Sequence, residues 1–140
     1  MDIQLAVGAL LYIIDDGTLR ELSVKAPKLR LSVESFRLLT PRLQSLIVDA
    51  GALKISEFYG MLLEMPEVEN ISFKVSEIDV SKEESGSIWL NLTALKNLKR
   101  LNIEVAEPCK EDIKLVLPEG CVATARGVCC DCQRCRVFSL

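Results

Sequence analysis

Short segments in which apolar residues alternate with polar residues recur along the chain. Four of them align as Leu19-x-x-Leu22-x-Val24, Leu43-x-x-Leu46-x-Val48, Val68-x-x-Ile71-x-Phe73 and Leu98-x-x-Leu101-x-Ile103. Their first residues are separated by 24, 25 and 30 positions. Because successive side chains of a strand point to opposite faces, each segment is predicted to form a short strand with one apolar face.

The stretches between these segments also agree with one another. Ten and twelve residues after the first three starts come the apolar pairs Leu29 and Leu31, Leu53 and Ile55, and Ile78 and Val80, each followed by a serine. Apolar stretches at 33–39, 58–65 and 88–95 follow and are predicted to be helical. One such unit cannot bury its apolar face, but stacked units can, with their strands paired in parallel and their helices on the other side of the core.

The repeated pattern resembles the leucine-rich-repeat family, whose units read L-x-x-L-x-L-x-x-N-x-L over 20–29 residues. The resemblance covers about Leu5 to Ile103. It implies an α/β solenoid of about four repeats, in which a curved parallel sheet carries helices on its convex side. The family's Asn position is held here by Pro27, Gly51, Ser76 and Ala106. Of these, Ser76 alone has a side chain that can bond the backbone of the turn, so the turns are expected to differ from the family's.

The N-terminus is predicted to lie inside a repeat. Leu5-Ala6-Val7-Gly8 precedes Leu19 by 14 residues, as Leu29-Arg30-Leu31-Ser32 precedes Leu43. Most of the first strand is therefore expected to be missing, although a terminal repeat normally needs a polar cap. Three arrangements follow: a homodimer through the uncapped N-terminal edge, a longer solenoid, or a minimal cap formed by residues 2–5.

Under the resemblance, the residues between the inward-pointing apolar ones face the concave side and form the candidate partner-binding site. They make three rows across the four strands: Glu21, Ser45, Asn70 and Arg100; Ser23, Ile47, Ser72 and Asn102; and Lys25, Asp49, Lys74 and Glu104. The third row alternates in charge, which predicts a ladder of cross-strand ion pairs. That ladder supports either the register of the strands or the docking of a partner.

Composition narrows the function. The 140 residues are 49% hydrophobic but only 5% aromatic, which indicates one domain with an aliphatic core. Phe36, Phe58, Tyr59 and Trp89 are expected in that core.

A formal net charge of −3 gives no basic field for nucleic acid. The longest apolar run, Leu5 to Ile14, is too short to span a membrane and lacks the pattern of a leader, so a cytoplasmic protein is expected.

Sequence motifs favour binding over catalysis. The chain has no histidine, no glycine-rich phosphate loop and no G-x-S-x-G or H-E-x-x-H motif. The sequence thus predicts a non-enzymatic scaffold that binds a protein partner through the concave sheet face or self-associates, without a cofactor unless zinc is bound at the C-terminal cysteines.

The last third of the chain holds six cysteines: Cys109, Cys121, Cys129, Cys130, Cys132 and Cys135. We expect a solenoid over residues 1–120 and a cysteine-rich cap or tail over 121–140. The cysteines have three alternative roles: a four-cysteine zinc site that uses the Cys132-x-x-Cys135 spacing, disulfides in any of 15 pairings, or reduced thiols in a cap. The first two roles give the alternative function, a metal- or redox-responsive module.

Overall fold

The computed structural model describes residues 1–6, 11–15, 17–31, 36–79, 87–107, 112–126 and 135–139. Its largest element is a sheet of six strands in the order β1-β3-β5-β6-β8-β10, every neighbouring pair of which is parallel. The strands are β1 (Asp2–Gln4), β3 (Glu21–Leu31), β5 (Ser45–Lys54), β6 (Asn70–Asp79), β8 (Arg100–Val105) and β10 (Val122–Arg126). The four predicted strand segments are β3, β5, β6 and β8, side by side and in this order.

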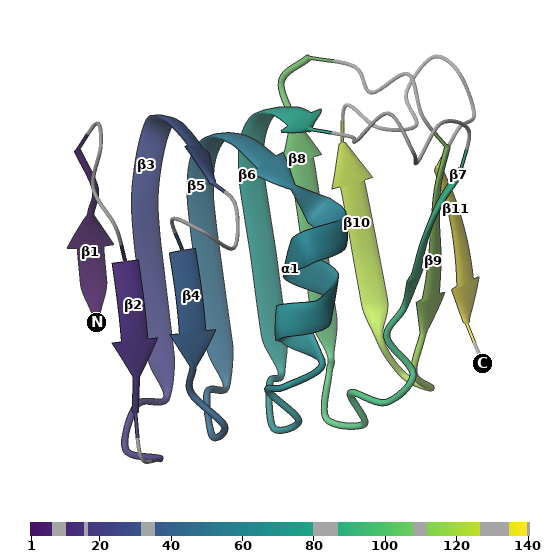
Figure 1. Ribbon diagram of the computed structural model, residues 1–140. Helices are drawn as coiled ribbons and strands as arrows, with labels where there is room; N and C mark the ends of the chain where they lie inside the picture. Colours follow the sequence, from purple (N-terminus) through teal and green to yellow (C-terminus); the bar gives the residue numbers. More distant parts are fainter. Residues whose placement is uncertain are drawn as a thin grey trace.

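A second layer lies behind this sheet. It consists of β2 (Leu11–Ile14) paired with β4 (Phe36–Leu39), then α1 (Ile55–Leu62), and then β7 (Ser87–Asn91), β9 (Asp112–Leu117) and β11 (Cys135–Ser139) in the sheet order β11-β9-β7. The chain alternates between the layers, and the strands of the second layer run opposite to those of the first (Figure 1). The protein is therefore a parallel-sheet solenoid with little helix.

The core fills the space between the two layers. Every second residue of the long strands is buried, as in β3, where Leu22, Val24 and Ala26 are at most 2% exposed. Phe58 of α1 packs between Phe36 of β4 and Phe73 of β6, with ring centroids 5.1 and 6.1 Å away. The inward side chains thus bury the apolar face that the alternating pattern predicted.

Successive turns stack through one repeated hydrogen-bond pattern. The carbonyl of Arg20 accepts hydrogen bonds from the N–H groups of Gln44 and Ser45, at 2.7 and 3.0 Å. The carbonyls of Gln44 and Glu69 accept the corresponding pairs of bonds from the next turn. Because each acceptor directly follows the first residue of an aligned segment, the sequence repeat and the structural repeat coincide.

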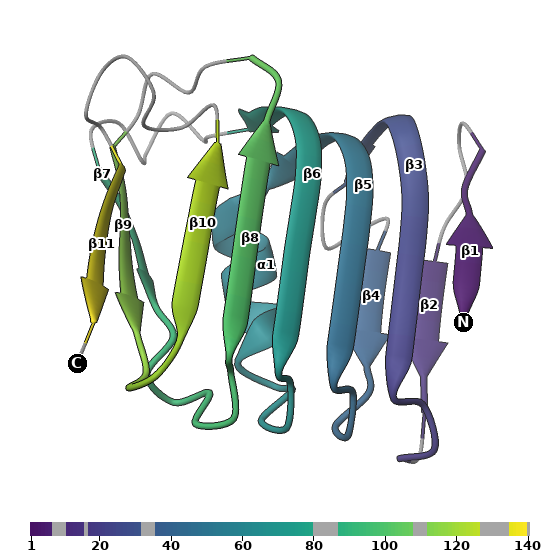
Figure 2. The same cartoon turned by 180° about the vertical axis from the view of Figure 1, so that it is seen from behind.

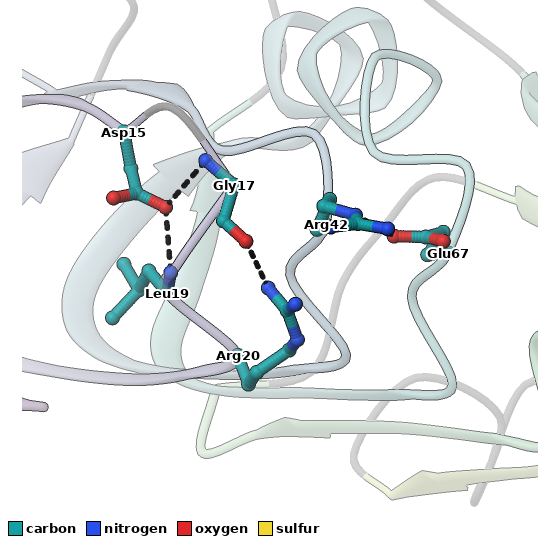
Figure 3. A network of polar contacts seen from close by, with 6 residues as sticks. All are labelled: Asp15, Gly17, Leu19, Arg20, Arg42 and Glu67. Carbon is teal, nitrogen blue, oxygen red and sulfur yellow. Dashed lines mark hydrogen bonds and ion pairs between the residues drawn. The ribbon is translucent and has the colours of Figure 1, made fainter.

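The turn before β3 is closed by a carboxylate (Figure 3). The Asp15 side chain accepts hydrogen bonds from the N–H groups of Gly17 and Leu19, at 3.1 and 2.6 Å, and from the hydroxyl of Thr18 at 2.8 Å. The bonds from Leu19 and Thr18 hold the pKa of Asp15 below its usual value. This turn requires glycine at position 17, because the φ of Gly17 is 114° and an added Cβ would lie 2.8 Å from the Arg42 side chain.

Two of the three predicted helices are wrong. The stretch 58–65 overlaps α1, but residues 36–39 form β4 and residues 88–91 belong to β7. Residues 33–35 lie outside the described part of the chain. Alternate residues of β4 are buried, and β4 finds a parallel partner in β2, as β7 does in β9. Pairing with a neighbouring strand therefore gives hydrogen-bond partners to the backbone N–H and C=O groups of these segments, which in a helix would bond to one another.

The register in the second half of β3 also differs from the prediction. Ala26 pairs with Ala50, but Arg30 pairs with Ala52, so β3 carries two extra residues at this point. Leu31 rather than Leu29 consequently aligns with Leu53. Gly51 lies against this bulge, and a Cβ added there would be 3.0 Å from the carbonyl oxygens of both Pro27 and Leu29.

Candidate protein-binding face

The three predicted rows belong to one face of the six-stranded sheet, called the outer face below, because their side chains alternate along each strand with side chains that are buried against the second layer. Figure 2 views the sheet from this side, with the second layer behind it. Cα pairing aligns Glu21, Ser45, Asn70 and Arg100 in the first row, Ser23, Ile47, Ser72 and Asn102 in the second, and Lys25, Asp49, Lys74 and Glu104 in the third. None of these twelve side chains is buried. The structure therefore brings all of the predicted partner-binding residues onto one surface.

Sheet pairing extends each row by residues that sequence reasoning missed. Asp2 and Gln4 of β1 align with Ser23 and Lys25. On the other side, Val122, Thr124 and Arg126 of β10 continue the three rows beyond β8. The third row thus reads Gln4, Lys25, Asp49, Lys74, Glu104, Arg126. The side-chain charge changes sign at every step from Lys25 to Arg126.

The predicted ladder of ion pairs does not form. None of the ion pairs found between described residues joins two members of the third row. Lys74 is exposed, and Asp49 and Glu104 are half-buried. Charged groups on neighbouring strands do not come into contact, because an exposed ion pair gains little over the loss of side-chain entropy. These charges are consequently available to groups outside the chain.

A shallow pocket of about 210 Å³ lies along the third row, which is close to the ends of β8 and β10. Its charged lining comes from Asp49, Lys74, Glu104 and Arg126, and its floor includes Ala50, Val75 and Val105. A second hollow, of about 230 Å³, borders Ile47, Ser45 and Ser23 near β1. Ile47 is 46% exposed and offers an apolar contact between the two hollows.

Cys121 belongs to the core of the solenoid. Its N–H closes a turn with the carbonyl of Pro118, as Leu98 does with Leu95 and Val68 with Met65 in the preceding turns. The side chain is 8% exposed, the thiol is free, and burial raises its pKa. Cys121 thus takes a position that leucine or valine holds elsewhere, and the alternation of Cys121, Ala123 and Ala125 was the signal for one more strand.

The other candidate cysteines are not placed by this structure. Cys109, Cys129, Cys130 and Cys132 lie outside the described residues, and of Cys135 only the strand position in β11 is described. Among the described residues, no group of three or more potential ligands is arranged to hold a metal ion. The proposed boundary after residue 120 falls directly before β10, which pairs with β8 in the main sheet.

Trp89 is not a core residue. It lies on β7 with 54% of its surface exposed, and the Lys114 ammonium lies 4.8 Å from its ring centroid. Phe36 and Phe58 are buried as expected, whereas Tyr59 is half-buried and donates a hydrogen bond from its hydroxyl to the Asn91 carbonyl at 2.9 Å. The aromatic ring of Trp89 instead covers the outside of the second layer.

Comparison with protein-family models finds no matching family. Neither the curated proteins nor the solved structures searched give a match. In the described part of the chain, no helix is both long enough and apolar enough to cross a membrane.

Proposed function

We propose that this chain is a leucine-rich-repeat solenoid that acts without catalysis, as a module that binds a protein partner through its outer face. The observation that carries the proposal is the in-register array of polar side chains on that face, none of which is buried, with Ile47 exposed among them. Protein interfaces combine such a polar rim with a smaller apolar centre. The rigid sheet behind the array holds these groups at fixed spacings, so little entropy is lost when a partner binds.

Two further features support membership of the leucine-rich-repeat type. The aligned segments occupy equivalent strands, and their turns repeat the same hydrogen bonds. The strands that replace two of the helices are compatible with this type, because the second layer still covers the core. One turn departs from the family's pattern. Ser76 holds the family's Asn position, but its side chain is exposed, and no hydrogen bond from it is found in the part of the chain that the structure describes.

The alternative, a metal- or redox-responsive module, gains no support from Cys121. A thiol must ionise to act as a nucleophile or a metal ligand, and burial opposes ionisation here.

Photo-crosslinking tests the binding proposal. A photo-reactive phenylalanine derivative replaces Ile47 on the outer face or, as a control, Leu39 on the second layer; the two side chains are 46% and 41% exposed. We expect a discrete protein adduct from position 47 and none from position 39. Equal adduct formation from both positions, or none from position 47, would contradict the proposal.

A further inference from the structure

We propose that the outer face binds a second copy of this chain, about a two-fold axis that runs along the strands between β5 and β6. This inference rests on the proposed function and names its partner. In the sheet order, the line between β5 and β6 divides the six strands into equal halves. Rotation about it places β5 over β6 of the second copy, β3 over β8, and β1 over β10.

The charges of the rows are complementary under this rotation. Glu21 then faces Arg100 of the second copy, because both lie in the first row, on β3 and β8. Lys25 faces Glu104 of the second copy in the third row, and Asp49 faces Lys74. Every charged residue of the twelve in the three rows thus meets an opposite charge, and each contact occurs twice, as in any isologous interface.

The uncharged positions fit the same arrangement. Ile47 faces Ser72 of the second copy, whose small side chain leaves room for the isoleucine on an apposed sheet. Ser23 faces Asn102, and Gln4 faces Arg126, so polar groups meet polar groups. Facing sheets lie about 10 Å apart, a gap that two long charged side chains can bridge from opposite sides.

Charge balance favours this partner over others. The six charges among the twelve predicted row residues sum to zero, with three acidic and three basic residues, whereas the whole chain carries −3. Two copies therefore repel each other elsewhere but not at this face. An axis across the strands, through the second row, is less favourable: it pairs Glu21 with Lys25 and Arg100 with Glu104, but leaves Asp49 and Lys74 facing uncharged residues.

The size of the face sets the expected strength. Six strands about 4.8 Å apart and about five residues long cover about 500 Å² per copy, or about 1,000 Å² for the pair. That is the low end for specific interfaces, so the dimer should form reversibly and weaken as salt screens its ion pairs.

Charge reversal provides the test, because each charged residue of one copy must meet an opposite charge on the other copy. In a dimer of Lys74→Glu or of Asp49→Lys, position 49 meets a like charge at position 74 twice. We expect each variant to raise the dimer dissociation constant at least about tenfold, measured by sedimentation of the full chain over a concentration series. In an equimolar mixture of the two variants, both contacts again join opposite charges, and heterodimers should form.

A second pair of variants, Lys25→Glu and Glu104→Lys, follows the same logic on β3 and β8. Circular dichroism of each variant checks that the fold is retained, and the second pair decides the test if a variant of the first pair does not fold. The wild-type chain remaining monomeric at all concentrations would overturn the inference, as would a mixture that forms no more dimer than its components.

The adduct mass in the Ile47 crosslinking experiment separates this inference from the proposed function. A self-adduct together with heterodimer formation supports both. An adduct with a different protein, from a chain that stays monomeric, retains the proposed function and overturns the dimer. A monomeric chain that gives no adduct at position 47 overturns both.

Discussion

The Arg30 guanidinium donates a hydrogen bond to the Glu77 carboxylate at 3.0 Å, although β3 and β6 are not neighbouring strands. Both residues are aligned with Ala52 of β5, so the ion pair passes over the methyl group of this alanine. Two strand spacings amount to about 9.6 Å, which two long side chains can span only above a small residue. The pair covers Ala52, which is 4% exposed, and ties three strands together at the corner of the solenoid.

We expect the Glu77→Gln variant to lower the free energy of unfolding by at most about 1 kcal/mol, because the Arg30 and Glu77 side chains are 58% and 44% exposed to screening solvent. Urea denaturation measures the change, and Glu69→Gln, which removes the 2.8 Å ion pair with Lys99, is the matched control. Ala52→Leu should cost more, about 1–3 kcal/mol, because the larger side chain needs the space beneath the pair. If Glu77→Gln lowered the free energy of unfolding more than Ala52→Leu does, the Arg30–Glu77 ion pair would contribute more to stability than its exposure suggests.

A methyl group added to Gly51 should destabilise the protein. The Cβ of Gly51→Ala would lie 3.0 Å from two backbone carbonyl oxygens of the β3 bulge, and backbone cannot move aside as a side chain can. We expect a loss of about 1–3 kcal/mol in thermal or urea unfolding. Gly60→Ala is the control, because nothing lies within 4 Å of that position and alanine favours the helix α1; it should be neutral or stabilise by up to about 1 kcal/mol. Equal losses in both variants would show that the contact at Gly51 is not the cause.

The Asp15 turn makes stability depend on acid pH. Hydrogen bonds in the folded chain lower the pKa of this carboxyl, so between its folded and unfolded pKa values the unfolded state binds more protons. Its contribution is therefore complete above the ordinary value of 3.8 and is lost as pH falls through the lower, folded pKa. The wild type should lose stability relative to Asp15→Asn as the pH of urea denaturation falls below about 4. Parallel pH profiles for the two proteins would rule out this linkage.

Burial of Cys121 should protect it from reagents. In the native protein we expect alkylation of this thiol, followed by peptide mass mapping, to be at least about tenfold slower than in urea, because the thiolate is disfavoured in the core. Cys121→Val should change the free energy of unfolding by less than about 1.5 kcal/mol, as similar apolar volume is retained. Cys121→Ser, which buries a hydroxyl, should cost about 1–3 kcal/mol. Rapid native alkylation at Cys121 would contradict its place in the core.

The alternating apolar residues were sufficient to predict four parallel strands and the register of their outward side chains. Val24, Val48, Phe73 and Ile103 lie on consecutive strands of one sheet, because a one-residue slip would turn the apolar face of any of them to solvent. The twelve predicted residues of the outer face follow from the same alternation. Local sequence determines these features because the period of two and the burial of aliphatic side chains act on each unit in the same way.

Only the tertiary structure decided that most of the second layer is formed by strands, and where the sheet ends. Phe36-Arg37-Leu38-Leu39 is too short for its period to separate helix from strand, and pairing with β2, distant in sequence, decides for the strand. Likewise, Lys25 and Asp49 are adjacent in register without forming the ion pair that their charges predicted, because hydration and side-chain entropy offset the attraction. The core role of Cys121 depends on the turn with Pro118 that stacks on the preceding repeats, a contact that residue identity does not reveal.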